Sequence, residues 1–430
     1  MDGEAHPDLS PADASVKFTV NLTEEPTPMY ARLLSLPSQS FFLFGPRGTG
    51  KSMWLSHVLP DAALNIDLLR SSTYLAYKRD PSLLGREVAA LPPGSWVVID
   101  EVQKAPELLD EVHALMFASG HDTRFALSGS SARKLKKSNA NMLAGRAWSK
   151  RMFPLSALET SEDFRLEEAL RYGQMPLRIN AASTADQVEF LDAYVETYLR
   201  EEIWQEALVR NLDAFHRFLS VAAVVNGQIL NLSNIARDVG VARSTVQGYF
   251  SILEDTLIGW QLPAWRKRAK VKEVAHPKFY LFDCGVQRAL AGLHRDKPSR
   301  GERGVLFETW LLNEFRALNA YGSHGAEMFY WRTESGNEVD LIFKRGAWAT
   351  GIEIKSTTTW NDRFNKGLRT LLDAGDIDHA FGVYAGEREL RFGDIRVLPY
   401  QKALQAAWQG DFIAEARNGH SSPDGGQHVL

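Results

Sequence analysis

The sequence predicts an α/β protein in three parts: a parallel sheet with a phosphate-binding loop, a helical and winged-helix-like module, and a second α/β domain. Short apolar runs alternate with longer amphipathic stretches between residues 41 and 155. A helical pattern without a strand signal follows from about 160 to 230, and mixed helix and strand patterns return between 276 and 405. We therefore expect a disordered tail at 1–25, a nucleotide-binding core at 26–160, a helical module at 161–275, a second α/β domain at 276–405 and a C-terminal tail at 406–430.

The apolar runs of the N-terminal part are predicted to be strands of one parallel sheet. They read "FFLFG", "AALNIDL", "WVVIDE", "RFALSGS" and "SKRMFPLS". Continuous apolar runs bounded by turns suit strands that are covered on both faces, as in a parallel sheet with helices on either side. This is the expected setting for a nucleotide-binding loop.

The stretch "GPRGTGKS", which follows the first of these runs, has the spacing of the Walker A phosphate loop. Its glycines let backbone N–H groups turn toward phosphate oxygens, and the helix that follows adds its N-terminal dipole. Lys51 would reach the β- and γ-phosphates, and Ser52 would bind Mg²⁺. The residues expected to bind ATP or ADP are Gly45, Pro46, Arg47, Gly48, Thr49, Gly50, Lys51 and Ser52.

Polar residues at the ends of two further strands complete the predicted nucleotide site. Asp100 and Glu101 end the run "WVVIDE". Asp100 would hold Mg²⁺ through its water shell, and Glu101 would polarise the water that attacks the γ-phosphate. Ser128 and Ser130 follow the next strand, where Ser130 could sense the γ-phosphate; the alternative is an ordinary serine at a strand end.

The last third carries a second group of chemically useful residues. Glu308 lies in a predicted helix, and Asp340 begins a predicted strand. Glu353 and Lys355 are two apart on the next strand and so point to one face, where an antiparallel pairing would bring Asp340 beside Glu353. Asp340 and Glu353 could then bind Mg²⁺ or Mn²⁺ and activate a water for phosphodiester hydrolysis, with Lys355 orienting it. The alternative is a solvated sheet edge.

Two features of the middle part suit nucleic acid. Residues 232–258 have helix-turn-helix spacing, with a helix opened by Ser233 and a turn at Gly240; the alternative is a packing or lid module. The run "WRKRAKVK" combines Trp265 with cations that could follow a phosphate backbone, or could form a solvated edge strand. The cations assigned to nucleic acid, with DNA favoured, are Arg266, Lys267, Arg268 and Lys270.

Composition narrows the class of protein. The formal net charge of -4 describes no uniformly basic coat, so nucleic acid must bind at local patches. Cys284 is the only cysteine, which excludes an intramolecular disulfide and a cysteine-based zinc site and fits a reducing cytoplasm. The acidic first residues are no signal peptide, and no apolar run approaches the roughly 20 residues of a membrane-spanning helix. We expect a cytoplasmic protein without membrane contact.

The order of the motifs resembles a known family. The segments "GPRGTGKS", "VVIDEVQK", "LSGSSARKL" and "LAGRA" before "FPLS" look like AAA-type ATPases of bacteria and archaea whose C-terminal domain of unknown function is related to PD-(D/E)XK nucleases. The resemblance covers about residues 28 to 405. It implies a homo-oligomeric ring of the hexamer type, in which Arg146 reaches the γ-phosphate bound by the next subunit. Arg133 is the competing residue, and the alternatives for Arg146 are a local salt bridge or a role in its own subunit.

In the C-terminal part the resemblance assigns catalytic roles. Asp340 stands for the first acid of the nuclease motif, Glu353 and Lys355 for its E-x-K element, and Glu308 for the helix acid. The chain departs from the pattern in having Val339, not proline, before Asp340, which lowers the specificity of the match. The implied function is Mg²⁺-dependent ATP hydrolysis coupled to nucleic acid that is held or cut. The alternative is an ATP-driven assembly switch whose C-terminal domain binds DNA or protein without cleavage.

Overall fold

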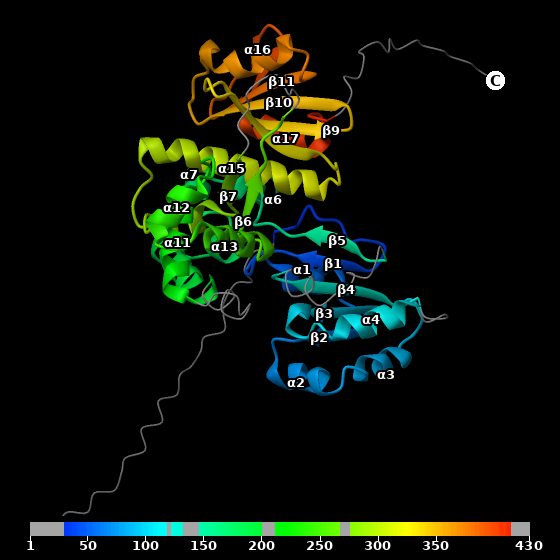
Figure 1. Ribbon diagram of the computed structural model, residues 1–430. Coiled ribbons are helices and arrows are strands. Elements are labelled where there is room, and N and C mark those ends of the chain that lie inside the picture. Colours follow the sequence, from blue (N-terminus) through cyan, green and yellow to red (C-terminus); the bar gives the residue numbers. More distant parts are fainter. Residues whose placement is uncertain (1–29, 118–121, 132–145, 200–210, 267–275, 414–430) are drawn as a thin grey trace, which may run out of the picture.

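The computed structural model describes residues 30–117, 122–131, 146–199, 211–266 and 276–413. Within these ranges the chain forms a sheet domain at its N-terminal end, a helical module, and a second sheet domain at its C-terminal end (Figure 1). No helix in these ranges is both long and apolar enough to cross a membrane. The predicted features that lie outside the described residues are the tail at 1–25, Arg133, and the cations Lys267, Arg268 and Lys270.

The N-terminal domain is built on a sheet in the order β2-β3-β4-β1-β5, whose paired strands are parallel. Because β4 lies between β1 and β3, the loops after these three strands leave the sheet at one edge. The predicted parallel α/β sheet is confirmed. Its elements are β1 (Phe41–Phe44), α1 (Lys51–Val58), β2 (Leu64–Asp67), α2 (Ser71–Arg79), α3 (Leu83–Ala89), β3 (Trp96–Asp100), the 3-10 turn η1 (Val102–Lys104), α4 (Leu108–Phe117), β4 (Arg124–Gly129) and β5 (Trp148–Arg151).

Strand β1 shows why the central runs are apolar throughout, whereas the run that forms the edge strand β5 is mostly exposed and not covered on both faces as expected. Phe41 and Leu43 pack in one cluster with Trp54 of α1. Phe42 and Phe44 point to the opposite face, where they pack in a second cluster that includes residues of α4. Both faces of the sheet are covered, so every side chain of the strand is buried and the sequence shows no polar alternation.

The helical module follows β5 and has a core of its own. Helices α12 and α13 form the predicted helix-turn-helix around Gly240, whose φ is 75°. Asn231 caps α12 by accepting a hydrogen bond from Asn234 N at 3.1 Å. The expectation that Ser233 opens this helix is wrong, because Ser233 lies inside its first turn. The helices are α6 (Ala157–Thr160), α7 (Leu166–Tyr172), α8 (Pro176–Ile179), α9 (Thr184–Ala193), the π-helix η4 (Tyr194–Leu199), α11 (Leu212–Val224), α12 (Leu232–Val239), α13 (Arg243–Asp255) and α14 (Cys284–Leu290).

The antiparallel pair β6 (Gly259–Leu262) and β7 (Lys278–Leu281) joins the helical module to the C-terminal domain. Beyond β6 the chain runs along the next sheet, where Trp265 N donates a hydrogen bond to Tyr330 O at 2.7 Å. The Trp265 side chain is buried in the C-terminal core, so it is not available to nucleic acid beside the cations of the basic run. Arg266, the described member of the basic run, is exposed.

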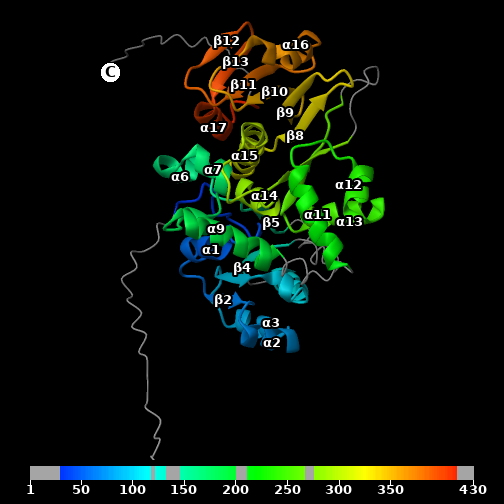
Figure 2. The same ribbon diagram turned by 90° about the vertical axis from the view of Figure 1, so that its left-hand side faces the viewer.

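The C-terminal domain is a mixed sheet in the order β12-β13-β11-β10-β9-β8 with helices on both faces. Along β10, Ile352 and Ile354 pack in a cluster with α15 and α17, whereas Gly351 faces Leu368 of α16. Helix α15 lies between this sheet and the rest of the chain (Figure 2). The elements are α15 (Arg300–Tyr321), β8 (Glu327–Arg332), β9 (Glu338–Arg345), β10 (Trp348–Lys355), the 3-10 turn η5 (Asp362–Asn365), α16 (Lys366–Asp373), β11 (His379–Tyr384), β12 (Leu390–Phe392), β13 (Ile395–Pro399) and α17 (Tyr400–Gln409).

The predicted C-terminal tail begins too early. Helix α17 continues to Gln409, and Phe412 and Ile413 are buried. Thr350 Oγ1 donates a hydrogen bond to Phe412 O at 2.6 Å, which fastens this segment to β10. Residues 406–413 therefore belong to the folded domain, and 414–430 lie outside the described residues.

Candidate functional site

The phosphate loop joins β1 to α1 at the carboxyl end of the sheet. Gly48 and Gly50 have φ values of 80° and 91°, in the left-handed region that residues with a side chain rarely adopt. A Cβ on Gly45 would lie 2.4 Å from Met152 O, so the close approach to the chain after β5 also requires glycine. The predicted residues 45–52 thus form one turn that leads into a helix N-terminus, an arrangement that can bind phosphate.

The Lys51 side chain folds back over this loop and is 5% exposed. Its Nζ donates hydrogen bonds to Gly45 O at 2.8 Å and to Pro46 O at 3.1 Å. Thr49 Oγ1 donates to Pro46 O at 2.8 Å and so braces the same turn. A lysine held here can exchange a backbone carbonyl for a phosphate oxygen, and its position fits the predicted role.

Ser52 and Asp100 meet beside the loop, although they come from α1 and β3. Ser52 Oγ donates a hydrogen bond to Asp100 Oδ2 at 2.5 Å. Ser128, at the end of β4, donates to the other carboxylate oxygen, Asp100 Oδ1. Hydroxyl and carboxylate oxygens are the ligands that Mg²⁺ prefers, so the residues present fit a Mg²⁺ ion held by Ser52 and Asp100.

Glu101 leaves the end of β3 in a left-handed conformation with φ of 58°, which is uncommon for a residue with a side chain. Its N–H donates to Ser128 Oγ at 3.2 Å. Gln103 Nε2 donates to the Glu101 carboxylate and to Ser130 Oγ, the latter at 2.9 Å. Gln103 therefore connects the predicted base to the predicted sensor. No sequence motif singled out Gln103, because its contact with Ser130 depends on the pairing of β3 with β4.

A largely apolar cavity of about 450 Å³ lies beside the phosphate loop. Gly50 of the loop, Met53 and His57 of α1, and Pro176 of α8 line it. The cavity thus lies between the N-terminal domain and the helical module. Concave, mostly apolar sites of this size accept small molecules with a flat ring.

The helical module also rests directly on the loop. Tyr194 OH donates a hydrogen bond to Arg47 O at 3.0 Å. A Cβ on Gly48 would lie 2.9 Å from Met175 Cε and 3.6 Å from the Tyr194 ring. A change in the conformation of the loop must therefore displace side chains of the module.

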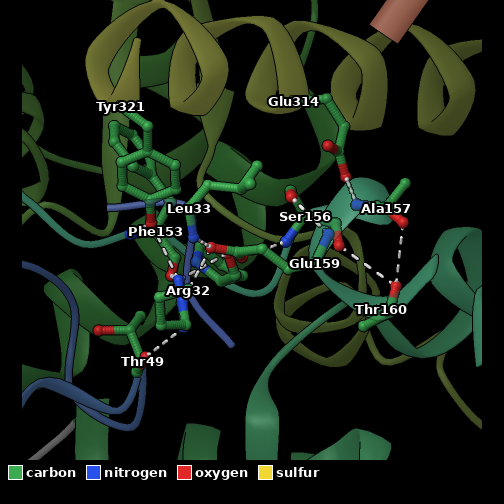
Figure 3. A network of polar contacts seen from close by, with 11 residues as sticks. Arg32, Leu33, Thr49, Phe153, Ser156, Ala157, Glu159, Thr160, Glu314 and Tyr321 are labelled. Carbon is green, nitrogen blue, oxygen red and sulfur yellow. Dashed lines mark hydrogen bonds and ion pairs between the residues drawn. The ribbon is translucent and has the colours of Figure 1, made fainter. Parts of the chain in front are cut away.

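A buried arginine upstream of β1 fastens the loop to the C-terminal domain (Figure 3). Arg32 donates hydrogen bonds to Thr49 O at 3.0 Å, to Phe153 O at 2.6 Å and to Tyr321 OH on α15 at 2.9 Å. Its Nε pairs with Glu159 Oε1 at 3.0 Å. Because a buried guanidinium must be fully paired, these partners hold three distant segments in one arrangement. No sequence motif marks Arg32.

Glu314 forms a second link between α15 and the segment after β5. Its Oε1 accepts a hydrogen bond from Ala157 N at 2.9 Å, beside the capping box that Ser156 and Glu159 form at the start of α6 (Figure 3). Burial raises the pKa of Glu314 to about 8. The carboxyl is therefore protonated in the folded chain at neutral pH.

Arg146 lies just before β5, at the end of the strand that is remote from the phosphate loop. Its guanidinium carbon lies 3.4 Å from the centroid of the Phe117 ring, and Nη1 donates to Met116 O at 3.3 Å. The side chain is exposed. Because β1 and β5 are parallel and the loop follows the opposite end of β1, Arg146 is turned away from the phosphate loop of its own chain.

The predicted acids of the C-terminal part come together. The antiparallel register of β9 and β10 places Asp340 beside Glu353. Lys355 Nζ pairs with Glu353 Oε1 at 2.5 Å and with Asp340 Oδ2 at 3.4 Å, so Glu353 and Lys355 share a face as predicted. Glu308 reaches the same region from α15. Burial raises its pKa, and the charge of Asp340 raises it further.

Four residues outside the predicted set, Lys278, Tyr280, Arg332 and Glu338, complete this group. Lys278, the first residue of β7, pairs with Glu308 Oε1 at 3.1 Å and with Glu338 Oε1 at 2.6 Å. Tyr280 OH donates to Glu308 Oε1 at 2.6 Å, and Arg332 Nη1 donates to Glu338 Oε2 at 3.1 Å. A sequence pattern could not reveal Lys278, because it arrives from a separate part of the chain.

The charges of this group are balanced internally. Burial and then Asp340 raise the pKa of Glu353 well above its ordinary value. Burial alone would lower the pKa of Lys278 and of Lys355, but the surrounding carboxylates raise both. Among the described residues, no three or more His, Cys, Asp or Glu side chains are spaced to hold a metal ion. In this arrangement the group does not fit the Mg²⁺ or Mn²⁺ ion expected at Asp340 and Glu353.

Comparison with protein families bears on the phosphate loop. Residues 37–161 match the model of an AAA domain. This match supports a P-loop ATPase. Downstream of the AAA domain, residues 163–297 and 303–403 match two models described as domains of unknown function, DUF8612 and DUF4143. The resemblance to AAA-type ATPases is thus confirmed for the N-terminal domain, while kinship of the C-terminal domain with nucleases stays a prediction.

Two similar whole chains are described as uncharacterized proteins. The uncharacterized proteins Mb2031c of Mycobacterium bovis and Rv2008c of Mycobacterium tuberculosis are each 27% identical over 381 residues, which cover 86% of this chain and 82% of the relative. The crystal structure of protein VC1899 from Vibrio cholerae aligns with 87% of this chain and 97% of its own, at 11% identity and a TM-score of 0.20. A TM-score this low says nothing about the fold.

The raised pKa of Glu314 predicts a pH dependence of stability. The folded chain keeps a proton that the unfolded chain releases above the ordinary pKa of 4.5, so stability falls as the pH rises from 4.5 to about 8. We expect Glu314→Gln to flatten the decline of Tm over this range. Calorimetry between pH 5 and pH 8.5 measures Tm for each variant. The control is Glu327→Gln, at an exposed position, which should keep the wild-type slope. Equal slopes for wild type and Glu314→Gln would contradict the assignment.

Proposed function

We propose that this chain is a Mg²⁺-dependent ATP hydrolase that works as a homo-oligomeric ring of the hexamer type. In this proposal the nucleotide cycle moves the helical module and the C-terminal domain, which hold nucleic acid, with DNA favoured over RNA. The observation that carries the ATPase part is the convergence of Lys51, Ser52, Asp100 and Glu101 at one sheet edge, on a loop with left-handed glycines.

The chemistry assigned to these residues follows from their positions. Mg²⁺ would supply charge neutralisation for the phosphates when bound. Glu101 is oriented from both sides, because its N–H contacts Ser128 and its carboxylate accepts from Gln103. A carboxylate held in this way can polarise a water for attack on the γ-phosphate. Ser130 shares Gln103 with Glu101, which supports its role as the residue that senses this phosphate.

The cavity beside Gly50 supports ATP as the nucleotide. It begins where the phosphate loop enters α1, so a base could occupy it while the phosphates lie on the loop. Met53 and Pro176 offer apolar contacts for the two faces of a ring. Since Pro176 belongs to the helical module, a bound base would touch both parts of the chain.

The position of Arg146 supports the ring. It is exposed on the sheet edge opposite the phosphate loop and held in place by Phe117 and Met116. An arginine there can complete only the site of a neighbouring subunit, where it would stabilise the charge of the transferred phosphoryl group. Multi-angle light scattering with and without ATP tests the assembly itself.

The contacts of Arg32 and Tyr194 support coupling between ATP and the remainder of the chain. Arg32 donates hydrogen bonds to Thr49 O in the loop and to Tyr321 OH on α15. Tyr194 of the helical module contacts the loop at Arg47. A loop that closes on a triphosphate would shift both contacts, and so both downstream parts.

Nucleic-acid binding is proposed from the helix-turn-helix of α12 and α13 and from the basic run that begins with the exposed Arg266. Two outcomes are proposed for the C-terminal domain. The meeting of Asp340, Glu353 and Lys355 favours a nuclease. The ion pairs of Lys278 favour the alternative, a switch in which ATP changes the assembly and the C-terminal domain binds without cleaving. We favour the switch.

Two substitutions separate binding of ATP from its hydrolysis. Lys51→Ala removes the charge that would meet the phosphates, so we expect loss of nucleotide binding. Glu101→Gln keeps the shape but not the base, so we expect unchanged binding and hydrolysis slower by about 100-fold or more. Fluorescent ATP binding and phosphate release measure the two steps, with Glu111→Gln on α4 as control. Wild-type hydrolysis by Glu101→Gln would refute the assigned base.

Mixing two inactive variants tests the arginine between subunits. Arg146→Ala alone should hydrolyse ATP at least about 100-fold more slowly. In mixed rings with Lys51→Ala, some interfaces unite an intact loop with an intact Arg146, so activity should return. The exposed Arg79→Ala is the control and should behave as wild type. Mixed rings that form, as mass measurement shows, and stay inactive would disprove action across the interface.

The basic run predicts a salt-dependent contact with DNA. Alanine at Arg266, Lys267, Arg268 and Lys270 should weaken duplex binding for all sequences and flatten its dependence on salt, because fewer counterions are released. Fluorescence anisotropy at two salt concentrations measures this, with alanine at the exposed Arg388 and Arg391 as control. DNA should also stimulate wild-type ATP hydrolysis. The nucleic-acid proposal fails if the wild-type chain binds no DNA at low salt.

A further inference from the structure

The carboxylate cluster of the C-terminal domain, which consists of Glu308, Glu338, Asp340 and Glu353, faces a lysine from a different part of the chain. We propose that Lys278 is the resident cation of this cluster and that docking of β7 keeps the C-terminal domain closed to divalent metal ions. The inference concerns this domain alone and does not depend on ATP hydrolysis.

The ammonium group occupies the space in which an ion would have to bind. Lys278 Nζ lies 2.6 Å from Glu338 Oε1 and 3.1 Å from Glu308 Oε1. The side chain is 5% exposed, and the charge of Asp340 also acts on it. A buried ammonium paired with two carboxylates meets their need for positive charge, and its own charge repels a second cation.

Strand pairing on both sides fixes the position of Lys278. Its backbone lies opposite Leu262 of β6 on one side and forms a bridge with Ile229 on the other. Leu230 N donates a hydrogen bond to Pro277 O at 2.9 Å next to this bridge. The ammonium also lies 5.4 Å from the centroid of the Tyr330 ring, which favours a cation there. The backbone of Lys278 is therefore held beside the cluster as long as β7 stays paired.

Charge, rather than access, excludes the metal. A cleft of about 590 Å³ reaches the cluster, with Lys278, Glu308 and Glu338 in its wall and Gln228 and Thr333 at its sides. An ion could enter this cleft. It would meet carboxylates that are already paired, Glu308 and Glu338 with Lys278 and Glu338 also with Arg332.

The inner half of the cluster supports the same conclusion. Glu353 is 7% exposed, and in the described part of the chain its Oε2 has no hydrogen-bond partner. Its other oxygen contacts Lys355 at 2.5 Å. Burial, followed by the charge of Asp340, raises the pKa of Glu353, because both disfavour the ionised carboxylate that a metal would bind. An unpartnered carboxylate oxygen marks the position that a ligand would take once the neighbouring positive charge is removed.

The lysine and the acids come from separate parts of the chain. Lys278 lies within residues 163–297 and the four acids within residues 303–403, which match different domain models. Lys278 is thus an intramolecular contact between two domains at a charged site. Movement of the helical module relative to α15 would open or close that site.

Removal of Lys278 should create a metal site. In the nucleotide-free full chain, titration with Mn²⁺ followed by electron paramagnetic resonance counts bound ions. We expect Lys278→Met to bind one Mn²⁺ ion more than wild type, and wild type to bind no Mn²⁺ ion that Asp340→Asn removes. Adding Asp340→Asn to Lys278→Met should abolish this ion. The exposed Lys366→Met, in the same domain, should leave binding unchanged.

Two results would overturn the proposal. One is a wild-type chain that already binds a Mn²⁺ ion that Asp340→Asn removes; this comparison needs no change at Lys278. The other is a folded Lys278→Met, verified by circular dichroism and Tm, that gains no ion. If the methionine variant does not fold, Lys278→Gln, which keeps hydrogen-bond donors without the charge, replaces it and is judged by the same count.

Discussion

The buried guanidinium of Arg32 is the contact on which the arrangement of the whole chain depends. It joins the carbonyl of Thr49 in the phosphate loop, the turn after β5, Glu159 at the start of the helical module and Tyr321 of α15. An ion buried away from water is tolerated only when its donors are satisfied, so these partners cannot separate independently. Arg32 therefore links the phosphate loop, through hydrogen bonds, to helix α15, which carries Glu308 and Glu314.

Local chemistry explains which features could be predicted from the sequence. The central strands β1, β3 and β4 of the N-terminal domain are short apolar runs because both faces are covered, whereas the edge strand β5 is polar and mostly exposed. The glycines of the loop are needed for left-handed backbone at Gly48 and Gly50. The E-x-K element also follows from local geometry, since Glu353 and Lys355 must share a face of β10. The parallel sheet, the helical middle and the mixed C-terminal sheet were predictable for these reasons.

Contacts between distant segments could not be predicted in this way. Gln103 acquires its role only when β3 lies beside β4, and Arg32 only when three segments meet around it. The sequence grouped Trp265 with the neighbouring cations, but the chain after β6 inserts its side chain into the core of the C-terminal domain. Lys278 is the clearest case: an ordinary strand residue in sequence, it becomes the counterion of acids from another domain.

The outer strand of the C-terminal sheet has a consequence for how this domain can exist. Strand β8 is not an open edge, because Tyr330 exchanges backbone hydrogen bonds with Pro263 and Trp265 of the preceding module. The opposite edge is the short strand β12, Leu390–Phe392. A fragment without residues 259–281 would leave the N–H and C=O groups of Tyr330 in β8 unpaired. Unpaired edge strands can pair with strands of other chains, and this pairing leads to aggregation. The segment after β6 therefore protects part of the outer strand β8 from pairing with another chain.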